Sequence, residues 1–286
     1  MNALLGIAHG TPGSGRARYA VAMTMFQNGQ IGAAVLEAYR IAAASDIADP
    51  ADQLRDSGLT LPASVSTDPQ TPLHTLVREI DRYIATLTGP GIADARQAIG
   101  EFSQNPATPR AATATDNAVV HAHLRVAIDT LTASHPGLAS AMSATTPGLD
   151  WISYDGYDPA EIGESFARNH AYAMIIGADG PIPALDFDLG LFLIAPHILY
   201  RDHHHAAPEL YAPLTGPHGW RFGPDRRLTL KPAHHPVWNP PYRPHLTKVG
   251  PTPFLAIFAW TRDVKHAAKV IQANDWPQLE TLRLSL

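Results

Sequence analysis

The chain has 286 residues, of which 45% are hydrophobic and only 16% are charged. Its 21 basic and 26 acidic residues give a formal net charge of −5, whereas nucleic-acid and anionic-membrane surfaces need clustered Lys and Arg. The absence of cysteine excludes disulfide scaffolds, thiolate zinc sites, iron–sulfur clusters and cysteine nucleophiles. The sequence has no hydrophobic run near the roughly 18 residues of a membrane span and no basic signal-peptide start. We therefore expect a cytoplasmic protein that binds neither nucleic acid nor membranes.

The first half of the sequence predicts helices. In residues 72–87 the hydrophobic side chains recur at steps of three and four, which places them in one stripe along a helix. Thr71 suits the N-cap of this helix, and Pro72 suits its first position. We expect residues 1–148 to form a helical bundle or lid. Three further stretches carry helical patterns: 18–26, 31–44 and 120–131.

The hydrophobic period changes to two after a short polar stretch at residues 143–148. Residues 185–189 alternate hydrophobic and polar side chains, as a half-buried strand does. Many short strands bounded by turn residues are typical of an antiparallel sandwich or barrel. The predicted fold class is therefore α+β, with the helical region 1–148 followed by a β domain at 149–286. Short hydrophobic runs predict further strands at 173–176, 191–195 and 254–260.

Histidine is concentrated in the second half, where nine of the 15 histidines lie within residues 197–266. His203 and His205 are two residues apart, so in an extended strand both side chains project from the same face. Glu209 and Tyr211 form a second such pair. If adjacent walls of a barrel bring the pairs together, two imidazoles and a carboxylate suit Zn²⁺, Fe²⁺, Mn²⁺ or Ni²⁺ and leave positions open for a substrate. The alternative is a solvated surface cluster of histidines.

The spacing around these histidines is more specific than the cluster itself. His203-x-His205-x-x-x-Glu209, then six intervening residues and Gly216, resembles the first metal motif of the cupin superfamily. This resemblance implies a cupin-type barrel, a double-stranded β-helix, and a further histidine ligand from a second motif. His245 fits that role, because it follows a proline-rich turn and precedes a strand-like run. Two other histidines compete with it for this role: His234 and His235.

A longer pattern runs through residues 150 to 265. It is similar to the cupin-type dimethylsulfoniopropionate (DMSP) lyases, which cleave DMSP into dimethyl sulfide and acrylate. The resemblance implies a carbon–sulfur lyase that holds one divalent transition metal ion, Zn²⁺ or Fe²⁺ before Mn²⁺ or Ni²⁺. The metal ligands implied are His203, His205, Glu209 and His245. The pattern itself consists of Tyr200, the motif from His203 to Tyr211, Pro244-His245-x-Thr247 and Pro253-x-Leu-Ala-x-x-x-Trp260.

The chemistry of this reaction suggests roles for several aromatic residues. Elimination from DMSP removes a proton next to an anionic carboxylate, and a divalent metal ion at that carboxylate offsets its charge. A phenol has a usual pKa of about 10, but a nearby metal cation favours its anion. Tyr211 is therefore the candidate base, unless it is an ordinary barrel aromatic, and Tyr200 is the second candidate for base or substrate orientation. The family pattern implies that Trp260 contacts the sulfonium through a cation–π interaction, with Trp238, Tyr242 and Trp220 as further candidates.

Two other functions fit the same residues. One is a cupin Fe(II) dioxygenase that acts on another small carboxylate, and oxygen uptake would separate it from a lyase, since elimination consumes no oxygen. The other is a non-catalytic, metal-containing small-molecule binding or sensor protein. The expected partner is a small zwitterionic carboxylate substrate, and a homodimer is a candidate assembly.

Overall fold

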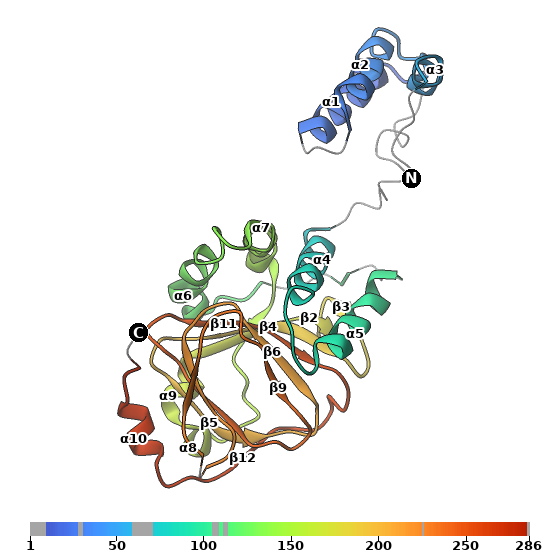
Figure 1. The fold of residues 1–286 in the computed structure, drawn as a ribbon. Helices are drawn as coiled ribbons and strands as arrows, with labels where there is room; N and C mark the ends of the chain where they lie inside the picture. Colours follow the sequence, from blue (N-terminus) through green and yellow to red (C-terminus); the bar gives the residue numbers. More distant parts are fainter. Residues whose placement is uncertain are drawn as a thin grey trace. The chain divides into compact units, whose positions relative to one another are not determined.

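The computed structural model describes residues 10–27, 31–58, 71–104, 109–110, 114–224 and 226–284 (Figure 1). The chain divides into two compact units, Met1–Gln70 and Thr71–Leu286. The described part of the first unit consists of the helices α1 (Ser14–Gln27), α2 (Ala33–Ala42) and α3 (Pro50–Asp56) around a small core of their own. Helices α1 and α2 coincide with the two weaker helical patterns of the sequence.

The second unit begins with four longer helices: α4 (Pro72–Ile84), α5 (Ile92–Gln104), α6 (Ala118–Asp129) and α7 (Pro136–Thr145). Thr71 is the N-cap of α4, as expected, because its side-chain oxygen accepts a hydrogen bond from the backbone N–H of His74 at 3.3 Å. Helices give way to strands after the short 3₁₀ turn Thr146–Gly148. The expected boundary at 148/149 is thus a change of secondary structure, whereas the compact units divide at 70/71.

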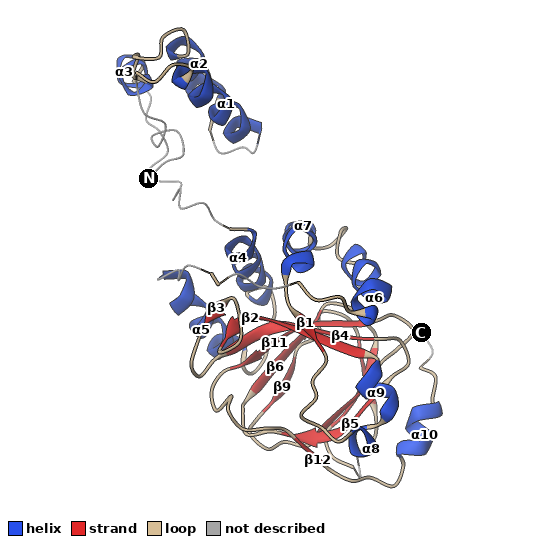
Figure 2. Cartoon of the chain, turned by 180° about the vertical axis from the view of Figure 1, so that it is seen from behind, coloured by secondary structure: helices blue, strands red, loops and turns tan. Residues whose placement is uncertain are grey.

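Two sheets form the remainder of the second unit (Figure 2). All strand pairs are antiparallel except β2 with β3. The first sheet has the order β1-β2-β4-β11-β6-β9, with β3 beside β2, and its strands are β1 (Trp151–Ile152), β2 (His170–Gly177), β3 (Ile182–Pro183), β4 (Asp188–Ile194), β6 (Glu209–Pro213), β9 (Val237–Asn239) and β11 (Phe254–Trp260). The second sheet has the order β12-β5-β10-β7-β8, with β5 (Leu199–His204), β7 (His218–Arg221), β8 (Thr229–Lys231), β10 (His245–Lys248) and β12 (Lys269–Val270).

Three short helices complete the described chain: α8 (Pro159–Ile162), α9 (Glu164–Arg168) and α10 (Trp276–Thr281). Most predicted strands are present, but the one at residues 185–189 is largely wrong. Only its last two residues belong to β4, and the Leu185 side chain is 83% exposed. Three hydrophobic residues that alternate with two polar ones are too few to distinguish a strand from a loop.

The first sheet is buried on both faces. In β4, Leu189, Leu191 and Leu193 belong to a core shared with α4–α7, whereas Phe192 and Ile194 belong to the core between the two sheets. Figure 1 shows α4–α7 together on the side of this sheet that faces away from β5 and β12. Burial on both faces explains why these strands read as continuous hydrophobic runs in the sequence.

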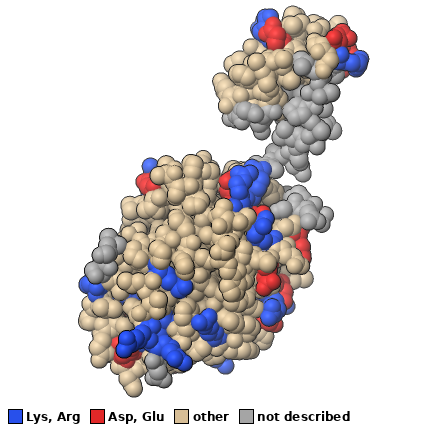
Figure 3. Space-filling view, in the orientation of Figure 1, with Lys and Arg blue, Asp and Glu red and all other residues tan. Residues whose placement is uncertain are grey.

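The surface carries few charges, in accord with the composition. On the face drawn in Figure 3, acidic and basic side chains are interspersed and separated by wide uncharged areas. Several form exposed pairs within one helix, such as Arg125 with Asp129 in α6, and such pairs contribute little to stability. In the described part of the chain, no helix combines the length and hydrophobicity required to cross a membrane.

Close packing inside the barrel predicts a difference between two glycine substitutions. A Cβ at Gly190 in β4 would lie 2.5 Å from the Ala173 carbonyl oxygen and 2.6 Å from Phe258 Cε1. Gly190→Ala should therefore lower the free energy of unfolding by about 1–3 kcal/mol in urea titrations. Gly100 in α5 has open space around its Cβ position, so Gly100→Ala is the control and should raise stability by about 0.5–1 kcal/mol. Equal effects of the two variants would contradict this account of the packing.

Candidate metal centre

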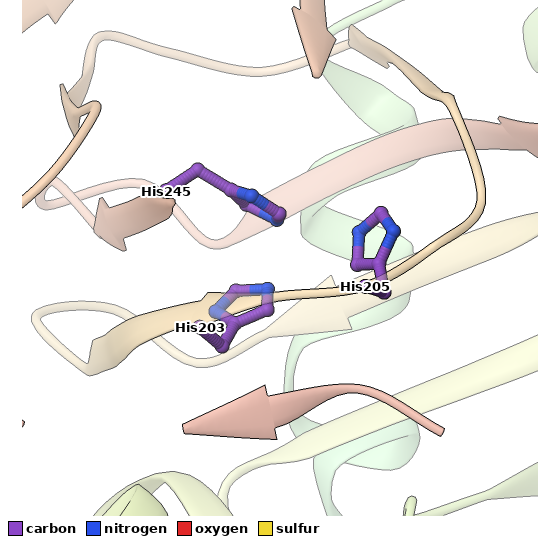
Figure 4. A group of neighbouring side chains, drawn as sticks. All are labelled: His203, His205 and His245. Atoms are coloured by element: carbon purple, nitrogen blue, oxygen red, sulfur yellow. The ribbon is translucent and has the colours of Figure 1, made fainter. Parts of the chain in front are cut away.

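Three of the predicted ligands, His203, His205 and His245, come together inside the barrel. His203 on β5 and His245 on β10 are directly opposite partners in the second sheet, and His205 follows β5 immediately. Each offers a ring nitrogen within 4.8 Å of the others. All three side chains are buried, with 1%, 4% and 1% of their surface exposed. Figure 4 shows the three rings converging on one point, which is the arrangement expected of a metal centre.

Backbone carbonyls fix the orientation of each ring. The Nδ1 atoms of His203, His205 and His245 donate to the carbonyls of residues 201, 207 and 243 at 2.8, 2.7 and 2.9 Å. A ring that donates from Nδ1 leaves Nε2 free to bind a metal ion. Burial lowers the pKa of His203 to about 3 and that of His245 well below its usual value, so both rings are neutral, as metal ligands must be. His245 Nε2 is buried and has no hydrogen-bond partner among the described residues.

Glu209, at the start of β6, adds an oxygen to this group. Its Oε2 lies 3.3 Å from His205 Nε2 and 3.4 Å from His245 Nε2. The carboxylate also accepts two hydrogen bonds, from Trp260 Nε1 to Oε1 at 2.8 Å and from Asn239 Nδ2 to Oε2 at 3.0 Å. Burial raises its pKa, but the neighbouring histidines and the Trp260 hydrogen bond outweigh burial and lower the pKa to about 2. Glu209 is therefore an anion inside the protein.

Strand register explains how the sequence assembles these contacts. Glu209 on β6 is directly opposite Trp260 on β11 and directly opposite Asn239 on β9. Directly opposite residues of antiparallel strands share a face, with their Cβ atoms about 4.5–5.5 Å apart. The two donors therefore flank the carboxylate in one row across the sheet. The role of Asn239 was not foreseen, because its spacing in the sequence carries no sign of this pairing.

Two tyrosines of the predicted site lie beside the ligands. Tyr211 is on the same face of β6 as Glu209, two residues further along the strand. Tyr200 stacks on the His203 ring with centroids 4.0 Å apart, and its hydroxyl lies 2.9 Å from that of Tyr157. Burial raises the pKa of both Tyr200 and Tyr211 well above 10, and Glu209 raises them further. Tyr157 is a second residue that the sequence did not point to, because it lies on the loop before α8.

A cavity of about 330 Å³ opens beside this group. Its wall includes Glu209, Tyr200, Tyr211 and Trp260, together with Tyr157. Ligand pockets are typically about 300–1,000 Å³ and mostly apolar, with a few polar groups that orient the ligand. The dimensions and lining suit a small molecule that reaches the carboxylate and the phenols at once.

Two aromatic residues predicted to bind substrate lie elsewhere. Trp238 packs against the helix-side core and so closely over Gly91 that a Cβ there would lie 2.0 Å from Trp238 Cε3. It neighbours Asn239 on β9, and adjacent residues of a strand point to opposite faces. Tyr242 is 62% exposed, and neither it nor Trp238 lines the cavity. Trp220 is fully buried in the barrel, with its ring 5.7 Å from that of Tyr211.

The two histidines that competed with His245 are outside the centre. His234 Nδ1 lies 3.0 Å from the hydroxyl of Tyr83 on α4, and its ring packs beside His135. His235 is exposed. The structure therefore groups His245, and neither competitor, with His203 and His205.

Comparison with known proteins adds to this geometry. The sequence profile of dimethylsulfoniopropionate lyases matches residues 93–256, more than half of the chain. The chain belongs to the DMSP lyase family. It is accordingly a carbon–sulfur lyase. No curated protein matches the chain.

Two solved structures share the fold over most of the chain. The DMSP lyase DddQ from Ruegeria pomeroyi is 21% identical, with a TM-score of 0.51, and the match covers 73% of this chain and 99% of that one. A chain from the crystal structures of the DMSP lyases RdDddP and RnDddQII is 19% identical, with a TM-score of 0.52, and the match covers 71% and 99%. The expected α+β fold, a helical region followed by a β domain of largely antiparallel sheets, is thereby confirmed.

Metal analysis of single variants tests the histidine group. Replacing His203, His205 or His245 with Ala should weaken metal binding by at least about tenfold and leave purified protein substoichiometric in plasma mass spectrometry. His204→Ala is the matched control, because His204 lies between two of the three and is only partly buried, with its ring toward Tyr242. We expect this variant to keep its metal. Full occupancy in His245→Ala would remove His245 from the ligand set.

Proposed function

We propose that this lyase releases dimethyl sulfide from DMSP and leaves acrylate, at the cavity beside His203, His205 and His245. The observation that carries the proposal is the junction of the buried histidine group with a cavity lined by Glu209 and Tyr211. A substrate carboxylate at the histidine group would bring its α-carbon near a phenol. Membership of the DMSP lyase family supports this choice of substrate.

We infer that the three histidines and Glu209 hold one divalent transition metal ion. Three imidazoles with inward-facing Nε2 atoms and one carboxylate fit Zn²⁺ or Fe²⁺ first, and Mn²⁺ or Ni²⁺ second. The Nε2 of His245 is buried and makes no hydrogen bond in the described part of the chain, which favours an ion over a purely hydrogen-bonded group. When bound, such an ion supplies positive charge that offsets a substrate carboxylate and favours the anion of a neighbouring phenol.

In the proposed reaction Tyr211 is the base. Its phenolate oxygen takes the proton from the carbon next to the carboxylate, and the electron pair of that C–H bond forms the C=C bond of acrylate. The bond between the β-carbon and sulfur breaks, and its electron pair leaves with sulfur as neutral dimethyl sulfide. The proton on Tyr211 then returns to solvent. DMSP thus yields acrylate, dimethyl sulfide and one proton.

Tyr200 is the proposed orienting residue. Its hydroxyl is hydrogen-bonded to that of Tyr157 at 2.9 Å, and its ring is held against His203. Both tyrosines line the cavity. A hydroxyl pair fixed in this way can position a substrate carboxylate or return the proton. Among the described residues, the Tyr211 hydroxyl forms no such hydrogen bond with another tyrosine.

The direct test is headspace detection of dimethyl sulfide after the purified, metal-loaded protein is mixed with DMSP, with acrylate measured in the same vial. We expect the two products in equal amounts and no oxygen uptake. Oxygen consumption without dimethyl sulfide would point to the dioxygenase alternative. Tight DMSP binding with neither dimethyl sulfide release nor oxygen uptake would point to the non-catalytic binding protein.

Tyr211→Phe tests the base. The variant should keep its metal and fold but lose turnover by about 10²–10⁴-fold, the usual contribution of a general base. Tyr83→Phe is the control, because it also removes a buried phenol hydroxyl but lies on α4, outside the cavity. Initial rates of dimethyl sulfide release provide the measurement, with metal content determined on the same samples. Unchanged turnover in Tyr211→Phe would exclude this residue as the base.

A further inference from the structure

The cavity has a second polar end, opposite Glu209. Asp188 begins β4 and is the direct partner of Trp260 on β11, and Trp260 is the direct partner of Glu209 on β6. The three residues therefore form one row across the first sheet, and all three line the cavity. Two strand spacings separate the backbones of Asp188 and Glu209, which is about 10 Å. The Trp260 side chain lies between the two carboxylates.

Asp188 has no cationic partner within the described part of the chain. No salt bridge or hydrogen bond to its side chain is present there, and its charged neighbours are two other carboxylates, Asp179 and Asp186. Burial raises the pKa of Asp188 to about 6, with smaller contributions from these neighbours. Lys265 and His266 also line the cavity, but both side chains are exposed and neither forms an ion pair with Asp188. A half-buried carboxylate without a counter-ion loses hydration that a bound cation would compensate.

The walls around Asp188 suit an organic cation rather than a metal ion. Tyr172, Phe258 and Trp260 line the cavity together with Asp188, and Phe258 and Trp260 lie on the same face of β11. Aromatic faces attract organic cations, and the attraction grows when water is excluded. A metal ion would require several oxygen ligands in place of rings. Carboxylate and rings together complement an onium group, a positively charged sulfur or nitrogen that carries alkyl substituents.

We propose that Asp188 is a specificity-determining residue that binds the cationic end of the substrate. It selects small zwitterions in which two methylene groups separate a carboxylate from a sulfonium or quaternary ammonium. The carboxylate of such a molecule lies at the Glu209 end of the row, and its cation lies over Trp260 toward Asp188. This inference rests on the proposed function, because it concerns the substrate of that same cavity.

The charge change during elimination predicts how Asp188 contributes. The sulfonium is positive in the bound substrate, is partly neutralised in the transition state, and becomes a neutral thioether in the product. Attraction to Asp188 is therefore strongest in the ground state, and interactions of this kind increase affinity without increasing kcat. A residue that acted on the reacting bonds would instead lower kcat when replaced.

Asp188→Asn, which keeps the shape and removes the charge, tests the proposal. We expect KM for DMSP to rise about tenfold, the loss of one partly screened charge pair, while kcat is unchanged or higher. The probe for charge is 4-methylpentanoate, in which an uncharged CH replaces the sulfonium sulfur. Its inhibition constant should stay the same or fall in the variant. Asp150→Asn, which removes an equal charge from an exposed side chain outside this cavity, should change neither value.

Calorimetric titration of DMSP and 4-methylpentanoate into the metal-loaded wild type and Asp188→Asn separates this inference from the proposed function. Absence of dimethyl sulfide from the wild type, with an Asp188-dependent preference for the cationic ligand, would overturn the reaction and support the recognition role. Turnover by the wild type, with equal changes for both ligands or none, would overturn the role of Asp188. A loss of kcat at constant KM would also overturn it, because Asp188 would then act on the reacting bonds.

Discussion

The structure of the site depends on keeping one buried carboxylate in place. Glu209 is only 2% exposed, and an isolated ionised carboxylate in such a position would be strongly destabilising. Hydrogen bonds from Trp260 and Asn239 hold its two oxygens from either side, and His205 and His245 face it across the barrel. Both donors are supplied by strand register, so a slip of β6 by one residue would turn the carboxylate to the opposite face and remove all four contacts at once.

The first sheet satisfies this requirement because its two faces have different tasks. Alternate residues of each strand pack beneath α4–α7, where a hydrophobic core fixes the register of β4, β6 and β11. The intervening residues face the inside of the barrel. There Phe192 and Phe254 form part of the core between the sheets, and a separate polar row is formed by Asp188, Trp260, Glu209 and Asn239. The helical layer therefore packs on the opposite face of the sheet from the site, and it stabilises the strand pairing that positions the site residues.

The sequence predicted those features that local spacing determines. The shared face of His203 and His205 follows from the two-residue period of a strand, and the hydrophobic stripe of α4 follows from the 3.6-residue period of a helix. His245 could be predicted only from the resemblance to a known motif, because its pairing with His203 joins two strands that are distant in the sequence. Strand β9 shows the limit most clearly. This strand has three residues, so the sequence shows no alternation from which to assign its two faces. Trp238 is the more obvious candidate for substrate binding, but its neighbour Asn239 faces the site. Asp188 and Tyr157 were missed for the same reason, since only pairing across the barrel gives them a role.

The row of residues across the first sheet also relates binding to release. A zwitterion meets opposite requirements at its two ends, since the histidine end suits its carboxylate and the Asp188 end suits its cation. The proposed elimination would remove the cation and leave the Asp188 end facing a neutral thioether, so the attraction proposed to hold the substrate there is absent for the product. Under this proposal dimethyl sulfide would be retained only by contact with aromatic rings, and acrylate only at the histidine end. Binding the two charges of the substrate at two ends of one cavity would therefore favour the substrate over both products, because neither product can make both contacts at once.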